Sequence, residues 1–496
     1  MYAERAGISL FDALHASSPD GSGPMVFPEG TITLVSQTVA RFRSIAVDDY
    51  GVPLSQVSVF ATEAMRRAGN AAAMLEAIKA AAPGLSVQIL APEVETLFGS
   101  VGARSGFVDV KGLFLDLGGG SVQMTYMDTF SAKANSHDET DYEVAAAQAG
   151  QSLPFGAARL IRILESSEAE VKATEEAKLQ AGMREAFENL RQRFPSLAAT
   201  ASAISSRGLD EASQRDVDDV GIDIYLCGGG FRGYGQMLMF NDPVQPYPVP
   251  SVNTYTVPGR HFQRTADMLE INQKVEGKIF GMSRRRRAQF AAIVTVVEAL
   301  IAAVPHIRSV TFCGGGNRQG ALMMKLPRAI REQNPLELIT ALESPSAGGR
   351  EDLRILESVL SSLLSALPKG VDLSRVNTVF SLGLGALFAR QIWIRAGERS
   401  DANASAVLHD AVARDPSCPG LTHLARAVAG LTLCARWDAS LAPVDEQLYH
   451  SLQALVVAAD PEAEFWAEYI GAVAAVLATL VPAWPRSEDR VPRAIQ

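Results

Sequence analysis

The chain has 496 residues, of which 47% are hydrophobic and 20% are charged, and its net charge is −10. This composition is typical of a globular protein with several domains, and the acidic balance argues against a nucleic-acid partner. The four cysteines form no closely spaced pair and no signal peptide opens the chain, so we expect reduced thiols and a cytoplasmic location. The apolar stretch at residues 469–481 is too short to span a bilayer, so we expect a buried helix and no membrane partner.

Strand and helix patterns alternate along residues 1–130. Apolar runs predict strands at residues 6–14, 57–61, 87–90 and 113–117. Helical spacing predicts helices at residues 31–47 and 64–81 and another that begins at Glu93. This alternation is typical of an α/β domain with helices packed on a mostly parallel sheet. We expect residues 6–14 and 113–117 to leave an uncovered strand edge.

Residues 113–123 combine a buried strand, a glycine turn and a second strand. The turn consists of Gly118, Gly119, Gly120 and Ser121. Glycines let successive backbone N–H groups point into one concavity, which suits a phosphate. Asp116 at the strand end can hold a hard cation such as Mg²⁺ or its water, and Gln123 can orient a water. A plain tight turn is the alternative, and the strand that follows excludes a Rossmann or P-loop motif.

The strand–glycine pattern returns twice within residues 131–334. One copy spans residues 224–232 and includes Gly228 and Gly229, and the other spans residues 310–318. Each copy predicts a strand, a glycine turn and a helix. A helix N-terminus behind a glycine turn suits a phosphate or ribose, while close strand–helix packing explains the same pattern.

From Pro335 onward helical patterns dominate, which predicts an all-helical C-terminal domain at residues 335–496. Residues 1–130 would then form a first lobe with the phosphate loop, and residues 131–334 a second lobe. The basic run Arg284–Arg287 is interpreted as a helix start or a polyanion-facing patch, with nuclear localisation as a weaker alternative.

Several segments, in order, resemble the exopolyphosphatase/guanosine-pentaphosphate phosphatase family. They lie at residues 61–66, 92–95, 116–123, 152–157, 226–232 and 316–320. The resemblance covers roughly residues 30–325 and implies the two-lobed actin–hexokinase–Hsp70-like (ribonuclease H-like) α/β fold. It also implies polyphosphate, ATP or another phosphate-bearing ligand, with Mg²⁺ as the metal.

The resemblance assigns Glu95 as the general base that activates water. Glu95 lies 21 residues before Asp116 (116 − 95 = 21), one strand away, so both can face one cleft. Attack on phosphorus needs a carboxylate beside a metal-held phosphate, because the water loses a proton. Arg66 could pair a phosphate through its guanidinium fork. Without the family context, Glu95 would be a helix-start acid and Arg66 a surface residue.

Two departures from the family pattern favour a regulator over an enzyme. The opening D-x-G-S-[NT]-x-x-R segment has no counterpart, so we expect a first lobe that is incomplete at its N-terminus and lacks its first strands. Gln123 stands where the phosphatases carry Glu, and a Gln side chain cannot act as a base.

Three further segments, at residues 283–289, 415–423 and 431–437, resemble a fungal regulatory branch of the family. That branch links mitochondrial state to nuclear transcription. We therefore expect a phosphate- or nucleotide-sensing regulator in mitochondria-to-nucleus signalling that docks a protein partner through its helical domain. The alternative is an active exopolyphosphatase or nucleotide phosphatase that uses Glu95-activated water and Mg²⁺.

Overall fold

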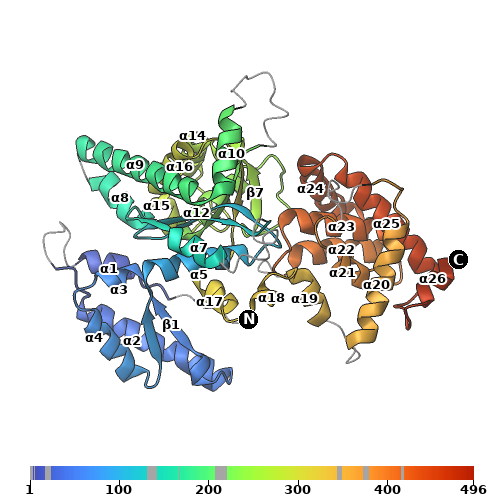
Figure 1. Cartoon of the computed structure of the whole chain (residues 1–496), viewed down its shortest axis with the longest axis horizontal. Helices are drawn as coiled ribbons and strands as arrows, with labels where there is room; N and C mark the ends of the chain where they lie inside the picture. Colours follow the sequence, from blue (N-terminus) through green and yellow to red (C-terminus); the bar gives the residue numbers. More distant parts are fainter. Residues whose placement is uncertain are drawn as a thin grey trace.

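The computed structural model describes residues 4, 6–16, 24–130, 142–166, 168–206, 220–342, 349–371, 379–414 and 418–495. Figure 1 shows three parts in chain order: a small N-terminal lobe, a larger α/β lobe and a helical C-terminal part. The lobes meet at α5 (Pro92–Arg104), which begins beside the small lobe and packs on the sheet of the larger one.

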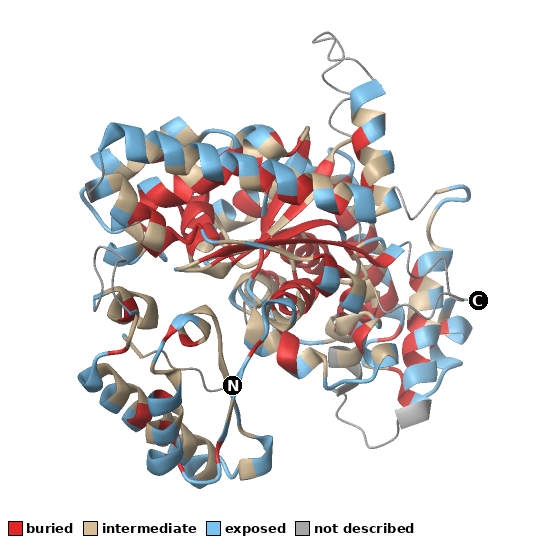
Figure 2. Cartoon of the chain, turned by 60° about the vertical axis from the view of Figure 1, so that its left-hand side comes forward, coloured by how far each residue is buried: buried red, intermediate tan, exposed pale blue. Residues whose placement is uncertain are grey.

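The small lobe holds a two-stranded parallel sheet of β1 (Ser58–Ala61) and β2 (Ser86–Ile89). Its helical segments are α1 (Leu10–Ala16), α2 (Glu29–Ser44), the π-turn Ile45–Asp49, the 3₁₀ turn Leu54–Gln56, α3 (Glu63–Arg67) and α4 (Ala71–Ala81). They pack around a small apolar cluster of Leu14, Phe27, Met65, Ala68, Met74 and Ile78. Figure 2 shows far fewer buried positions here than around the large sheet. The lobe therefore has little core of its own.

Two local predictions for this lobe need correction. The strand predicted over residues 6–14 is wrong, because Leu10, Ala13 and Leu14 follow helical spacing and contact the small-lobe cluster from α1. The helix predicted over residues 64–81 is two helices. Asn70 separates them, since its amide binds the backbone N–H and carbonyl of Phe27 at 2.8 and 2.9 Å.

The large lobe is built on a six-stranded sheet in the order β5-β4-β3-β6-β8-β7. Strands β3, β6 and β8 are parallel, whereas β4, β5 and β7 pair antiparallel to their neighbours. The strands are β3 (Lys111–Leu117), β4 (Val122–Asp128), β5 (Gln151–Leu153), β6 (Ile222–Cys227), β7 (Tyr255–Pro258) and β8 (Ile307–Phe312).

Helices cover both faces of this sheet, as Figure 2 shows by its buried central layer. One face packs against α5, α7 (Tyr142–Ala149) and α17 (Asn317–Met323). The other face carries most of the core, formed with α8 (Ala157–Ser166), α9 (Ala169–Arg193), α12 (Gly228–Phe240), α14 (Thr265–Lys274) and α16 (Phe290–Ala303). Shorter or peripheral helices are α10 (Pro195–Ser206), α13 (Gly259–Phe262), α15 (Arg284–Ala288) and α18 (Arg328–Arg331).

We predicted the lobe boundary at residue 130, but the change from the small sheet to the large one falls earlier in the chain, between β2 and β3. Strands β3 and β4 belong to the large sheet, because β3 pairs with β6 along Leu113–Asp116. The predicted open edge at residues 113–117 is also wrong, since β3 has a partner on each side. An apolar run buried on both faces is typical of a central strand, but alternation of strands and helices does not reveal which sheet the strand joins.

The described residues of the C-terminal part form helices joined by turns and loops, with no strand among them, as predicted. Its helices are α19 (Pro335–Leu342), α20 (Gly349–Ser365), α21 (Gly385–Gln391), α22 (Ser400–Ala413), α23 (His423–Arg436), α24 (Pro443–Ala459), α25 (Ala463–Leu480) and α26 (Arg490–Ile495). They surround a separate apolar core. The Tyr247 hydroxyl contacts His423 Nδ1 at 2.7 Å, and burial lowers the pKa of His423 to about 3, so this contact to the large lobe uses a neutral ring.

Among the described residues, α25 is the one helix long and apolar enough to cross a membrane by length and composition. It is longer than the apolar stretch predicted at residues 469–481, and 39% of its most apolar window is buried. The core helix of a soluble protein meets the same criteria.

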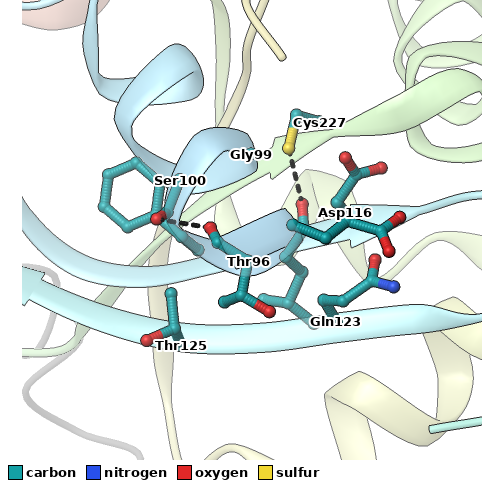
Figure 3. A pocket seen from close by; sticks show the side chains of 10 residues that line it. Thr96, Gly99, Ser100, Asp116, Gln123, Thr125 and Cys227 are labelled. Atoms are coloured by element: carbon teal, nitrogen blue, oxygen red, sulfur yellow. Dashed lines mark hydrogen bonds between the residues drawn. The ribbon is translucent and has the colours of Figure 1, made fainter. Parts of the chain in front are cut away.

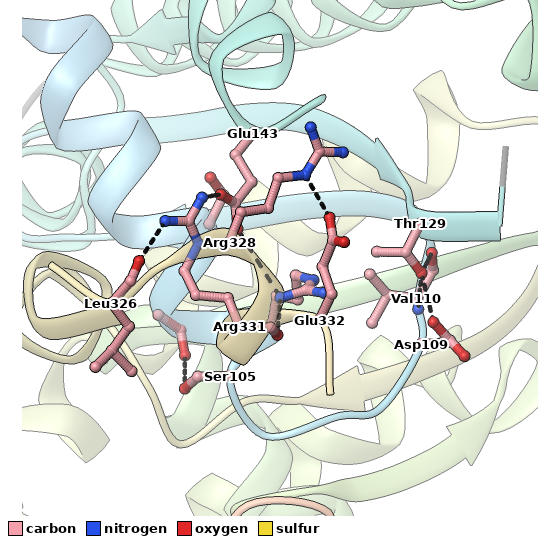
Figure 4. Close-up of polar contacts among 12 residues, drawn as sticks. Ser105, Asp109, Val110, Thr129, Glu143, Leu326, Arg328, Arg331 and Glu332 are labelled. Carbon is pink, nitrogen blue, oxygen red and sulfur yellow. Dashed lines mark hydrogen bonds and ion pairs between the residues drawn. The ribbon is translucent and has the colours of Figure 1, made fainter. Parts of the chain in front are cut away.

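A buried ion cluster joins α5, α7 and α18 on the face of the sheet opposite the main core (Figure 4). Glu143 is 1% exposed and pairs with Arg331 at 2.6 Å and with Arg104 at 3.9 Å. Arg331 also donates to the Leu326 carbonyl at 2.9 Å. The cluster therefore joins the last turn of α5 to the segment that leads into the helical part.

Replacement of Glu143 should destabilise the protein strongly. In Glu143→Ala two buried guanidinium groups would lose their carboxylate, which typically costs about 3–5 kcal/mol. Urea unfolding followed by circular dichroism measures the change. Asp489→Ala is the control, because it breaks an exposed pair with Arg493 and should cost less than about 1 kcal/mol. Equal midpoints for the two variants would contradict this role of Glu143.

Candidate functional site

Three strand ends that are followed by glycines meet at one edge of the large sheet. Because β3, β6 and β8 are parallel, their carboxyl ends lie together at Asp116, Cys227 and Cys313. Ligands of open α/β sheets bind outside the carboxyl ends of parallel strands. The glycine turns predicted after β3 and β8 are present, whereas after β6 the helix α12 begins directly at Gly228, and the topology brings the three glycine segments to the same edge.

Asp116 and Gln123 are direct neighbours across β3 and β4, so their side chains share one face of the sheet (Figure 3). With Glu95 from the first turn of α5, they line a cavity of about 10 Å³. That volume is about what one water molecule needs, and the lining offers it carboxylate and amide partners. The three residues predicted for water activation, metal binding and water orientation therefore lie around one water-sized space.

Arg66 lies beside Glu95 at the start of α5. Its guanidinium lies 2.8 Å from Glu95 Oε2, 3.0 Å from Glu63 Oε2 and 2.7 Å from the Leu90 carbonyl. The contact with Glu95 is an ion pair without hydrogen-bond alignment. The structure thus gives Arg66 a role in holding Glu95, and its predicted contact with a phosphate stays a prediction.

Both carboxylates of the cavity hold protons more tightly than usual. Burial raises the pKa of Glu95, Arg66 opposes that rise, and the nearby charges of Asp116 and Glu63 add to it. Burial also raises the pKa of Asp116, against the positive charge of Arg232 and the nearby Cys227 thiol. A raised pKa makes the ionised carboxylate a stronger base, which suits removal of a proton from water.

The glycine loop is a tight turn braced by α8. The Gly118 N–H donates to the Ser121 carbonyl at 3.0 Å. The carbonyls of Gly118 and Gly119 accept hydrogen bonds from the first N–H groups of α8, at 3.1 Å from Ala157 and 3.0 Å from Ala158. Helix α8 therefore fixes the conformation of the loop through its backbone.

Helix α1 lies against this loop. A Cβ placed on Gly120 would lie 3.2 Å from the Phe11 ring. Asp12 of α1 pairs with Arg162 at 2.9 Å and with Arg285 at 2.7 Å. Within the basic run, Arg285 thus contacts a carboxylate, and Arg287 donates to the carbonyls of Asn272, Gly277 and Val275. These contacts favour a structural role for those two arginines over a polyanion-facing one.

Gly228 and Gly229 differ in what surrounds them. Gly228 has φ +86° and its absent Cβ leaves room for Asp116 Oδ1 and the Leu117 carbonyl, so it shapes the site by close packing. Gly229 faces open space, with no atom within 4 Å of its Cβ position. Its predicted contact with a nucleotide stays a prediction. The third turn, at Gly315, packs against the Gly102 carbonyl of α5, so the packing interpretation holds there.

Sequence reasoning missed Asn317, which begins α17 behind the third glycine turn. Its Oδ1 is buried without a hydrogen-bond partner. A Cβ placed on Gly99 would lie 3.2 Å from this oxygen and 3.7 Å from Asp116 Oδ2, so both oxygens lie beside Gly99. The sequence did contain an indication of this role, because Asn317 is a polar residue directly after a strand and its glycine turn.

These oxygens are of the kind that Mg²⁺ prefers. No group of three or more His, Cys, Asp or Glu side chains in the described part of the chain could hold a metal ion. Mg²⁺ commonly takes one or two carboxylates and completes its shell with waters and substrate phosphates. Asp116 and Asn317 therefore fit a cation that a phosphate ligand would bring with it.

Two family models together match most of the chain. The model of the Ppx/GppA phosphatase family matches residues 3–329, and that of the RTG2 C-terminal domain matches residues 347–495. Retrograde regulation protein 2 of Saccharomyces cerevisiae is 29% identical over 494 residues, which is 97% of this chain and 76% of that protein.

Two solved structures were compared with the chain. An exopolyphosphatase from Cytophaga hutchinsonii is 16% identical over 62% of this chain and 86% of its own, with a TM-score of 0.43. The Ppx/GppA family member of Aquifex aeolicus is 17% identical over 63% of this chain and 85% of its own, with a TM-score of 0.40.

A methyl group at Gly228 should disturb the site, whereas one at Gly229 should not. Gly228→Ala adds a Cβ that overlaps Asp116 at a positive φ, so it should cost more than about 1 kcal/mol of stability. Gly229→Ala is the matched control with open space, and it should leave stability unchanged or slightly raised. Thermal melts of both variants test this pair, and equal melting temperatures would refute the packing role of Gly228.

Proposed function

The chain belongs to the Ppx/GppA phosphatase family, and on that premise we propose that it is a regulator that senses a phosphate-bearing ligand. The ligand binds at the turn Gly118–Ser121, with ATP and polyphosphate as the candidate classes. The observation that carries the proposal is the water-sized cavity between Glu95, Asp116 and Gln123 at the carboxyl edge of the large sheet. The family and the strand order agree with the predicted α/β, actin–hexokinase–Hsp70-like fold, with its all-helical C-terminal part.

The geometry supports a division of labour within the site. The turn offers backbone N–H groups to the phosphate, and Gly119 is exposed at its tip. Asp116 and Asn317 would hold Mg²⁺, which when bound neutralises phosphate charge and lowers the barrier to attack at phosphorus. Gln123 donates to Ser121 Oγ at 2.8 Å, which fixes its amide beside the cavity.

Residue contacts support weak or absent hydrolysis in this regulator. Arg66 neutralises Glu95 in an ion pair and so opposes its action as a base. Gln123 adds no negative charge for a metal. The alternative, an active exopolyphosphatase or nucleotide phosphatase, is favoured by the burial that raises the pKa of Glu95 and by the space for one water beside it.

Coupling from the site to the helical part supports the signalling role. Helix α5 carries Glu95 in its first turn and Arg104 at its end. Arg104 and Arg331 share Glu143, and Arg331 lies in the segment that leads into the helical part. A ligand that shifts α5 would therefore move groups next to a partner-binding domain. We propose that this protein acts in the cytoplasm in mitochondria-to-nucleus signalling, in keeping with the name of its yeast relative.

Binding to the turn should be lost in Gly119→Val. The valine side chain would occupy the space in which the backbone approaches an anion. The nearest atom to its Cβ would be Ala158 Cβ at 3.7 Å, an ordinary contact distance, so the variant should still fold. Calorimetry with ATP and with polyphosphate measures affinity. Gly277→Val, at a position with no atom within 4 Å, is the control and should bind as the wild type does. Equal affinity of Gly119→Val and wild type would exclude the turn as the site.

Phosphate release with Mg²⁺ should be slower than about 1 s⁻¹, the low end of ordinary enzyme rates. Gln123→Glu should raise the rate, because it restores a carboxylate beside the cavity.

Any residual rate of phosphate release should rise with pH above the usual range of glutamate, since Glu95 acts when ionised and its pKa is raised. Glu95→Gln should abolish the rate. Wild-type turnover above about 1 s⁻¹ that Glu95→Gln abolishes would favour the enzyme instead.

A further inference from the structure

The outward face of α25 carries an apolar stripe that the described part of the chain leaves largely exposed, except at Tyr469, which is partly buried. Its members are Phe465, Tyr469, Ala472, Val476 and Leu480, and we call them the α25 stripe. Phe465, Val476 and Leu480 are 59%, 61% and 44% exposed. The spacing of four, three, four and four residues places all five on one side of the helix.

The opposite face of α25 accounts for its role in the fold. Ala467, Ile470, Ala474 and Leu477 are buried in the core of the helical part. On the stripe, Phe465 packs against the Trp466 and Tyr469 rings at centroid distances of 5.2 and 6.1 Å. Tyr469 is fixed by its hydroxyl, which donates to the Ala366 carbonyl at 2.6 Å. Tyr469 also packs against the core, and the rest of the stripe is an ordered surface directed away from it.

The surroundings of the stripe are acidic. The segment from α24 to the end of α25 (residues 443–480) contains no Lys or Arg and six acidic residues: Asp445, Glu446, Asp460, Glu462, Glu464 and Glu468. Two of these are held between the helices, since Tyr449 donates to Glu468 at 3.4 Å and Gln453 donates to Glu464. One flank of the stripe thus carries fixed negative charge.

We propose that the α25 stripe binds a basic amphipathic helix of a partner protein. Apolar residues at alternating steps of four and three form the seam of paired helices, so a helix fits along the stripe. Lysines or arginines beside the partner's apolar face would meet the acidic flank. A second copy of this chain would bring two acidic flanks together, and anionic lipid would meet the same repulsion. This inference shares one assumption with the proposed function, namely that the helical C-terminal part binds a partner protein.

The test uses the full chain and a labelled synthetic helix of leucine and lysine, with leucines at heptad positions a and d. Fluorescence anisotropy without nucleotide should show binding that weakens as salt rises. The double variant Phe465→Ser/Val476→Ser should bind at least roughly tenfold more weakly, because it removes two exposed apolar contacts. Val444→Ser is the control: Val444 is 82% exposed on α24 outside the stripe and should not affect binding.

Three outcomes would overturn the proposal: equal binding by wild type and double variant, equal binding of a leucine–glutamate peptide of the same pattern, or stripe-dependent binding to neutral lipid vesicles or to a second copy. Thermal melts confirm that the variants fold. Measurement in Gly119→Val separates this result from the proposed function, since peptide binding should persist there while phosphate binding is lost.

Discussion

The close approach of α5 to α17 is the constraint on which the site depends. A Cβ at Gly102 would overlap the backbone of Gly316, and a Cβ at Gly320 would overlap the Phe98 carbonyl. Only glycine allows two helices to meet backbone to backbone in this way. This contact fixes α5 over the carboxyl edge of the large sheet, and so it sets the position of Glu95 relative to Asp116.

The same helix joins two environments of opposite character. At its start, burial and then the nearby carboxylates raise the pKa of Glu95, whereas Arg66 lowers it. At its end, Arg104 is buried with Glu143 and Arg331. A rigid helix with charged contacts at both ends transmits a displacement, and the small lobe at its start has little core to resist one. The candidate site and the helical part can therefore communicate without contact between them.

Local patterns along the chain predicted much of this arrangement, and the topology did not follow from them. The glycine turns and most helices could be predicted because strand period, glycine runs and helical spacing are local signals. The placement of β3 could not, because its pairing with β6 joins residues more than a hundred positions apart. That Glu95 and Asp116 face one cleft was expected from the family resemblance and from their spacing. The roles of Arg66 and Asn317 depend on side-chain contacts between separate elements, which no spacing in the sequence reports.

The most direct measurement of the central claim is hydrogen–deuterium exchange of the full chain with and without polyphosphate or ATP in the presence of Mg²⁺. We expect slower exchange at the amides of Gly119–Ser121 and in the first turn of α5, because the ligand would bind the loop and order Glu95 beside it. Slower exchange should also reach the segment around Arg331. No protection at saturating ligand, or protection confined to residues 284–287, would contradict the account.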